Sequence, residues 1–325
     1  MAISEMVLKN NELFARAPRK HKGVSYGKWG LIFIIPFILA YAIFTLIPQV
    51  VTIGYSFIEY YEEGLTVVGP NFAGFDNYVA LFTPNANGYI EILRFFGNTM
   101  ILWLIGAIPQ FAVALFLSVL FTSTRLRLKF TGLFKTIFYL PNVIMASAFA
   151  LLIYQVFSDV GPINAMITSS GGTAFKFLDQ EVTVRSLIAL MNYLMWFGNT
   201  TLVLMAGIQG IDESVFESAR IDGANAWQVF KDMTMPLLKP IFIYCLITSL
   251  IGGLQMFDVP QILTDGHGTP DFSSTTMVMY LNMKIGGHNY GLAGAVSVLL
   301  FFITGVLSVS VFRLTGDRNK QGRGQ

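Results

Sequence analysis

Three residues of one apolar segment have the types and the spacing to bind an uncharged molecule rich in hydroxyl groups. Asn192, Trp196 and Asn199 are separated by four and then three positions, so a helix would carry all three on one face. Side-chain amides both donate and accept hydrogen bonds, as sugar hydroxyls require. An indole ring beside them suits the apolar face of a sugar. The three residues therefore predict a face that can bind a sugar.

Other polar residues interrupt the apolar blocks of the chain, namely Asn98, Gln110, Asn142, Gln155 and Gln255. A polar side chain is costly when it faces lipid, so each should face other helices. We expect most of them to make hydrogen bonds between helices and a few to line a pathway for cargo. Asn142 directly follows Pro141, a residue that bends helices.

The sequence contains no motif for catalysis or for nucleotide binding. No G-x-x-x-x-G-K-[ST] loop occurs, because Gly27-Lys28 lacks the earlier glycine and the following Ser or Thr. There is no nucleophile elbow, no zinc-ligand cluster and no dinucleotide fingerprint, and the three histidines are scattered. The single cysteine, Cys245, lies in an apolar run and predicts a buried structural thiol. We expect neither an enzyme nor a bound cofactor or metal.

Six apolar blocks must position these residues, roughly 31–58, 95–124, 136–158, 186–211, 240–258 and 289–312. Hydrophobic residues make up 54% of the 325 and charged residues 12%, against about 25% charged in soluble domains. Each block can cross about 30 Å of hydrocarbon as a helix, the fifth only with residues from its flanks. The blocks do not alternate as barrel strands would. The predicted fold is therefore all-α, a polytopic membrane protein with six transmembrane helices.

The first block resembles a signal peptide only briefly, at Ala40-Tyr41-Ala42. The apolar run continues well past this site, which predicts an uncleaved span that bends at Pro36 and ends near Pro48. We expect a tail at 1–28, a transmembrane domain at 29–314 and a second tail at 315–325.

Lysine and arginine predict the orientation of the chain. If residues 1–28 are cytoplasmic, the cytoplasmic segments hold 17 of the 21 basic residues, and the outer segments hold only Arg94, Lys176, Arg185 and Lys284. The positive-inside rule then places both termini and the segment 212–240 in the cytoplasm. The formal charge of +2 is too small to suggest a nucleic-acid partner.

The segment 212–240 is polar but regular enough to fold. Acidic residues such as Asp212 and Glu213 lie at its start, where a helix dipole favours negative charge. Gly223 interrupts the pattern, apolar residues resume at helical spacing, and Pro236 is expected to end the second helix before the fifth span. The segment predicts a helix, a turn and a helix. Its apolar residues, which require a partner surface, are Val215, Phe216, Ala219, Trp227 and Phe230.

The same segment resembles the E-A-A, x3, G, x9, I-x-L-P motif of importer permeases that work with a binding protein and an ABC ATPase. The matching residues are Glu217, Ser218, Ala219, Gly223, Met233, Met235 and Pro236. Ser218 replaces an alanine, and Met233 and Met235 replace Ile and Leu. In that family the segment docks on a cytoplasmic ATPase and couples ATP-driven closure to the membrane helices. The resemblance implies that Glu217 contacts the ATPase and that Gly223 forms the turn.

Two further elements resemble the carbohydrate branch of this family, which includes the maltose and glycerol-phosphate permeases. Residues 72–78 are similar to F-x-G-x-x-N-Y, and residues 263–270 to L-T-x-G-G-P, from which His267 and Thr269-Pro270 depart. Gly291 and Ala295 at the start of the last span also fit and favour close helix packing. By analogy with the maltose permease, the resemblance implies cargo contacts at Asn142, Asn192, Trp196, Asn199, Gly253 and Met256.

The resemblance implies a multi-pass protein of the cell (cytoplasmic or inner) membrane that imports a carbohydrate, with an oligosaccharide as the expected cargo, by alternating access. Its partners would be a second homologous permease, two cytoplasmic ATPases that bind ATP and Mg²⁺, an extracytoplasmic binding protein and the lipid bilayer. A non-sugar polar cargo such as glycerol phosphate remains an alternative. A secondary transporter or channel for a neutral polar solute is a further alternative; it predicts ionisable residues inside the spans or paired broken helices, and neither is clear in the sequence. A membrane enzyme would require clustered His, Asp or Glu, and the sequence shows no such cluster.

Overall fold

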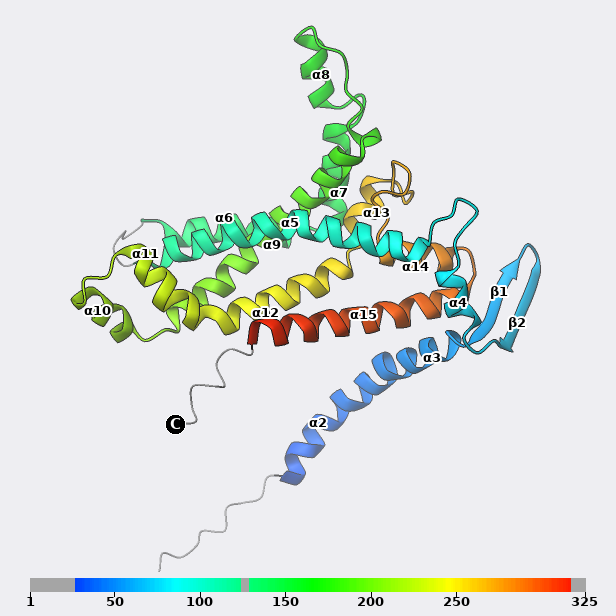
Figure 1. The fold of residues 1–325 in the computed structure, drawn as a ribbon, viewed down its shortest axis with the longest axis horizontal. Helices are drawn as coiled ribbons and strands as arrows, with labels where there is room; N and C mark the ends of the chain where they lie inside the picture. Colours follow the sequence, from blue (N-terminus) through cyan, green and yellow to red (C-terminus); the bar gives the residue numbers. More distant parts are fainter. Residues whose placement is uncertain (1–26, 124–128, 317–325) are drawn as a thin grey trace, which may run out of the picture. The chain divides into compact units, whose positions relative to one another are not determined.

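The computed structural model describes residues 27–123 and 129–316 (Figure 1). The chain divides into two compact units, residues 1–51 and 52–325. Within the described residues, six helical segments are long and apolar enough to cross a membrane, and they span 29–55, 91–122, 146–169, 181–209, 226–263 and 290–315. Among the described residues, the strands are confined to one short hairpin. The all-α fold with six apolar helices is confirmed.

The first apolar helix continues through Pro48, and the prediction that it ends there is wrong. α2 (Gly27–Tyr41) leads into the π-helical turn η1 (Ala42–Leu46), and α3 (Ile47–Tyr55) follows without a break. The amide of Ile47 donates to the carbonyl of Ala42, five residues earlier. Proline has no amide hydrogen, and its ring clashes with the carbonyl four residues back in an α-helix. The wider turn that precedes Pro48 relieves this clash.

The same arrangement carries the fifth apolar helix through Pro236. α11 (Ala226–Gln228), the π-helical turn η3 (Val229–Thr234) and α12 (Met235–Leu254) form one continuous helix. The amide of Met235 donates to the carbonyl of Phe230, again five residues earlier, and Pro236 follows at the start of α12. The prediction that Pro236 ends a helix is therefore wrong, because a π-turn accommodates it.

The block at 136–158 is two helices rather than one. α6 (Thr131–Val143) ends two residues after Pro141, and α7 (Ala146–Phe157) begins after the extended residues Ile144 and Met145. Pro141 removes one backbone hydrogen bond from α6. α8 (Pro162–Ser169) and the short turn η2 (Phe177–Asp179) then lead to the next long helix.

The centre of the second unit is a layer of long helices packed on one another. α5 (Glu91–Thr122) and α9 (Glu181–Gln209) lie side by side, and α12 packs against both. A Cβ on Gly106 would lie 3.1 Å from the carbonyl oxygen of Ala189, so the two backbones are in close contact. α15 (Tyr290–Gly316) runs beside α12 (Figure 1). The apolar cluster between α5, α9 and α12 includes Leu204 and Leu238, both fully buried.

Short elements complete the ends of this layer. β1 (Ile58–Glu63) and β2 (Thr66–Phe72) form an antiparallel hairpin that the sequence patterns did not predict, and α4 (Asp76–Phe82) follows. The remaining helices are α10 (Glu213–Ile221), α13 (Asp258–Leu263) and α14 (Met277–Gly286).

Candidate functional site

A cavity of about 300 Å³ lies between α5, α9 and α12. Its wall on α9 carries Asn192, Trp196 and Asn199, so the predicted shared helix face is present and it opens into a cavity. Gly253 and Met256 of the predicted set also line it. Their role as cargo contacts stays a prediction.

The amides on the α9 wall differ in how their hydrogen bonds are used. The Nδ2 of Asn192 donates to the carbonyl of Ile188 at 3.0 Å and contacts the Sδ of Met256 at 3.3 Å. No hydrogen bond joins the side chain of Asn199 to another residue in the part of the chain described here. Trp196 is 47% exposed. Asn199 and Trp196 are therefore available to a molecule in the cavity.

Several lining residues were not among the predicted cargo contacts, although Gln110 was noted as a polar residue of its span. Trp103 and Gln110 come from α5, and Tyr244, Thr248 and Gly252 come from α12. The α12 residues recur every fourth position and end at Met256, a spacing that could have been found in the sequence. The α5 residues carry no such pattern, and Gln110 is partly used, because its Nε2 donates to Thr200 Oγ1 at 2.8 Å.

Asn142 does not line this cavity. Its Nδ2 donates to the carbonyl of Met195 at 3.0 Å, and this bond joins α6 to α9. Asn142 thus has the interhelical role that was expected for most polar residues of the spans. Its role as a cargo contact stays a prediction.

The cavity wall is uncharged: the lining residues include no Asp, Glu, Lys or Arg. Amides, hydroxyls and aromatic rings supply its polar and flat apolar surfaces. Such a wall can bind neutral hydroxyl-bearing molecules, and it offers no cation to neutralise an anionic one.

The segment that follows α9 forms the predicted helix, turn and helix. Asp212 caps α10, since its Oδ1 accepts from the amide of Ser214 at 2.9 Å. This hydrogen bond holds the pKa of the Asp212 carboxyl below its usual value. At the other end of α10, Gly223 has φ +73°. The amides of Gly223 and Ala224 donate to the carbonyls of Arg220 and Ala219 at 3.1 and 2.9 Å, a Schellman motif.

The second helix of this segment begins with a capping box. Asn225 accepts from the amide of Gln228 at 2.9 Å, and Gln228 accepts from the amide of Asn225 at 2.8 Å. The turn at Gly223 is therefore fixed on both sides by hydrogen bonds.

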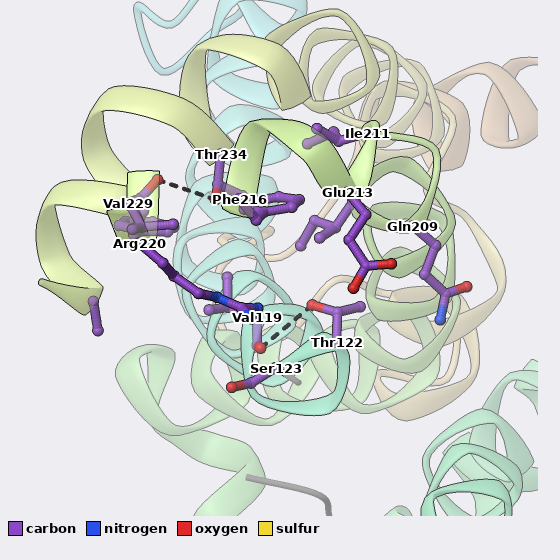
Figure 2. Close-up of a pocket in the computed structure, with 13 residues that line it drawn as sticks. Val119, Thr122, Ser123, Gln209, Ile211, Glu213, Phe216, Arg220, Val229 and Thr234 are labelled. Carbon is purple, nitrogen blue, oxygen red and sulfur yellow. Dashed lines mark hydrogen bonds between the residues drawn. The ribbon is translucent and has the colours of Figure 1, made fainter. Parts of the chain in front are cut away.

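A second cavity, of about 360 Å³, lies behind α10 (Figure 2). Phe216, Glu213 and Arg220 of α10 line it together with Val119 and Thr122 at the end of α5. Figure 2 shows these side chains directed toward one another around the space. Val229, Phe230 and Thr234 of the following helix also line it.

The residues of the E-A-A-like motif differ in their exposure to solvent. Glu217 and Ser218 are exposed on α10, whereas Ala219 is buried. Met233 and Met235 are half-buried and Pro236 is exposed. Ile221 and Trp227, on either side of the turn, are 86% and 67% exposed. The turn therefore presents two large apolar side chains beside an acidic one.

The two loop elements have structural roles. In residues 72–78, the Nδ2 of Asn77 donates to the carbonyls of Ser56 and Ile58 at 3.1 and 2.9 Å. A Cβ on Gly291 would clash with the carbonyl oxygen of Ile58, so at this residue the start of α15 packs closely against β1 and not against a helix. In residues 263–270, Thr264 Oγ1 accepts from the amide of Gly268 at 3.0 Å.

Comparison with known proteins agrees with these features. Residues 92–316 match the family described as "Binding-protein-dependent transport system inner membrane component". The lactose transport system permease protein LacF of Rhizobium radiobacter is 30% identical over 293 residues, 89% of this chain and 94% of that protein. The arabinooligosaccharides transport system permease protein AraP of Bacillus subtilis is 28% identical over 295 residues, 90% of each chain.

A solved structure shares the fold. The chain is similar, with a TM-score of 0.73 and 22% identity, to a chain of a bacterial ABC transporter involved in the import of the acidic polysaccharide alginate; the match covers 93% of this chain and 100% of that one. The family match covers most of the chain and extends from the first residues of α5 to the end of α15. The chain belongs to the family of inner membrane components of binding-protein-dependent transport systems.

Proposed function

We propose that this chain is the membrane-spanning subunit through which an ATP-driven importer takes up a neutral carbohydrate, with an oligosaccharide as the expected cargo. The observation that carries the proposal is the uncharged cavity between α5, α9 and α12, lined by amides and by two indole rings. The relatives of this chain include a lactose permease and an arabinooligosaccharide permease.

The uncharged wall also discriminates between cargo classes. A glycerol phosphate or an acidic sugar would bring a negative charge into the cavity, where burial without a cation is costly. Among the described residues, no Lys or Arg lines the cavity. A neutral sugar is therefore favoured over the anionic alternative.

The partners proposed are a second homologous permease, two cytoplasmic ATPases and an extracytoplasmic binding protein. The segment 212–240 and both termini lie on the cytoplasmic side, in agreement with the distribution of Lys and Arg. α10 and its turn dock on an ATPase through exposed Ile221 and Trp227 and through Glu217. Apolar anchors beside a charge are typical of such docking sites.

The proposal is tested with the assembled complex in proteoliposomes. Sugar-loaded binding protein should stimulate ATP hydrolysis, and Asn199→Ala should raise the KM for sugar uptake by about tenfold, the effect of losing one or two hydrogen bonds. Gln155→Ala is the matched control, because this exposed amide of α7 lies outside the cavity lining. Sugar uptake by the chain without any ATPase, or equal KM values in both variants, would overturn the proposal.

A further inference from the structure

Trp103 of α5 fits against the backbone of Gly253 on α12. A Cβ built on Gly253 would lie 2.6 Å from Cγ and 2.9 Å from Cβ of Trp103, well inside the contact distance of about 3.5–4.0 Å. The Nε1 of Trp103 also donates to Ser249 Oγ at 3.2 Å, one turn earlier on α12. The indole therefore packs in the space left by the absence of a side chain at Gly253, and its hydrogen bond to Ser249 fixes its position.

The indole has close neighbours on α12 and in the adjacent apolar cluster, and it also borders the cavity. The atoms that meet Gly253 are Cβ, Cγ and Cδ1, which are the inner edge of the indole and the carbon that carries it, so a clash there requires the whole side chain to shift. Behind it, Trp103 packs against the apolar cluster that contains Ala107, Leu204 and Cys245. A close-packed interior does not take up extra volume easily. The open side is the cavity, which Trp103 lines.

We propose that Trp103 is a specificity-determining residue of the cavity: its indole, seated on Gly253, sets the width of the site and so the size of the neutral sugar that the site accepts. The part that concerns sugar rests on the proposed function, whereas the steric part does not. Gly253 then acts as the seat of Trp103 rather than as a contact to cargo. This role differs from the one that the resemblance implied for Gly253.

Gly252 supplies a matched control. It is adjacent to Gly253, lies in the same helix and lines the same cavity, but a Cβ built on it meets nothing within 4 Å. Alanine at either position adds one methyl group and the same helix propensity. Only Gly253→Ala displaces the indole.

The steric part is tested by thiol labelling of the assembled complex in proteoliposomes. Thr248→Cys places one thiol in the cavity wall once Cys245 is replaced by Ala, because the chain has no other cysteine. A small and a bulky biotinylated methanethiosulfonate are compared. Gly253→Ala should slow the bulky reagent about tenfold relative to the small one, in line with the cost of overpacking, and Gly252→Ala by less than about twofold.

A double-mutant cycle assigns the effect to Trp103. Trp103→Ala should speed the bulky reagent, and Gly253→Ala should then have no further effect. An equal effect of the two glycine variants, or a Gly253→Ala effect that persists without Trp103, would overturn the proposal. If the complex does not assemble with Gly253→Ala, the labelling rate of Trp103→Ala tests the proposal by itself. An unchanged rate for the bulky reagent in that variant would overturn the proposal.

Uptake of lactose and of maltotriose then tests the sugar part. Trp103→Ala should raise the ratio of trisaccharide to disaccharide uptake, and Gly253→Ala should lower it. If the predicted labelling rates are observed but the complex takes up no sugar, the steric role of Trp103 would stand and the proposed function would be wrong. Sugar uptake with a ratio unchanged in both variants would defeat the role of Trp103 alone.

Discussion

Gly198 of α9 lies directly against the peptide unit of Phe138 on α6. A Cβ on Gly198 would overlap the carbonyl oxygen of Phe138 and lie 3.0 Å from the amide nitrogen of Tyr139. The next residue, Asn199, lines the cavity. The position of the α9 wall therefore depends on a contact between two backbones that tolerates no side chain.

Gly198→Ala should destabilise the protein by about 1–3 kcal/mol, because neither backbone can yield without moving a helix. Thermal unfolding of the purified complex in detergent measures this loss. Gly305→Ala in α15, where a Cβ meets nothing within 4 Å, is the control and should not lower the unfolding temperature. Equal stability of both variants would disprove the contact.

Asn142→Ala should lower stability without changing cargo affinity. The variant loses the bond to the carbonyl of Met195, and a polar bond between membrane helices contributes about 0.6–1.7 kcal/mol. The KM for sugar uptake should stay unchanged, because Asn142 lies outside the cavity lining. A raised KM with normal stability would instead support the role as a cargo contact that the resemblance implied.

Gly223→Ala should weaken the coupling of binding protein to ATP hydrolysis. The residue has φ +73°, and a Cβ built on it meets nothing within 4 Å, so the penalty is conformational, roughly 1–2 kcal/mol for an ordinary residue. Gly223→Asn is the control, since asparagine tolerates this conformation. Stimulated ATPase activity should fall in the alanine variant and largely persist with asparagine. Equal activity in both would show that the turn geometry does not matter.

Arg185→Met should loosen the loop between α13 and α14. Arg185 donates from Nε and from an Nη to the carbonyl of Ser273 at 3.1 and 2.9 Å, and to Asn98 Oδ1 at 2.8 Å. Hydrogen bonds to charged groups contribute about 1.5–3 kcal/mol. Hydrogen exchange of residues 271–276 should therefore accelerate. Lys176→Met is the control, because its ion pair with Asp179 is exposed on both sides and contributes about 0–1 kcal/mol. The same acceleration in both variants would argue against the Arg185 network.

The cap of α10 should depend on pH in one direction. The folded pKa of Asp212 lies below the ordinary value of 3.8 because its carboxylate accepts hydrogen bonds from Ser214. The stabilisation is therefore complete above pH 3.8 and is lost as the pH falls through the lower folded pKa. At pH 7, Asp212→Ala should accelerate hydrogen exchange at Ser214 and at its neighbours in α10, with the α14 amides as an internal reference. Unchanged exchange would mean that the carboxylate does not cap the helix.

Local patterns predicted what local geometry decides. Helical spacing alone requires that one face carries Asn192, Trp196 and Asn199. The packing of α9 with α5 and α12 then makes that face one wall of a cavity. The turn at Gly223 follows from the conformational freedom of glycine and from the acidic start of α10. These features need no knowledge of neighbouring helices.

The features that could not be predicted from the sequence depend on contacts between helices or on the local helix geometry. Nothing in the sequence around Asn142 shows that Met195 lies next to it, and nothing around Trp103 shows that a glycine of α12 receives it. Pro48 and Pro236 predicted helix ends, but a π-turn precedes each, which proline spacing does not reveal. The hairpin at 58–72 was obscured by its position directly after an apolar span.

The uninterrupted helix from Ala226 to Leu254 supplies walls to both cavities. Phe230 and Thr234 belong to the cavity behind α10, and Tyr244 and Thr248 to the uncharged one. From Phe230 to Thr248 the axis is about 27 Å long at 1.5 Å per residue. We therefore expect a displacement at the Phe230 end to reach the Thr248 end as a rotation or translation of this one helix. The π-turn at Val229–Thr234 is the place where the helix can either transmit that displacement or deform and absorb it.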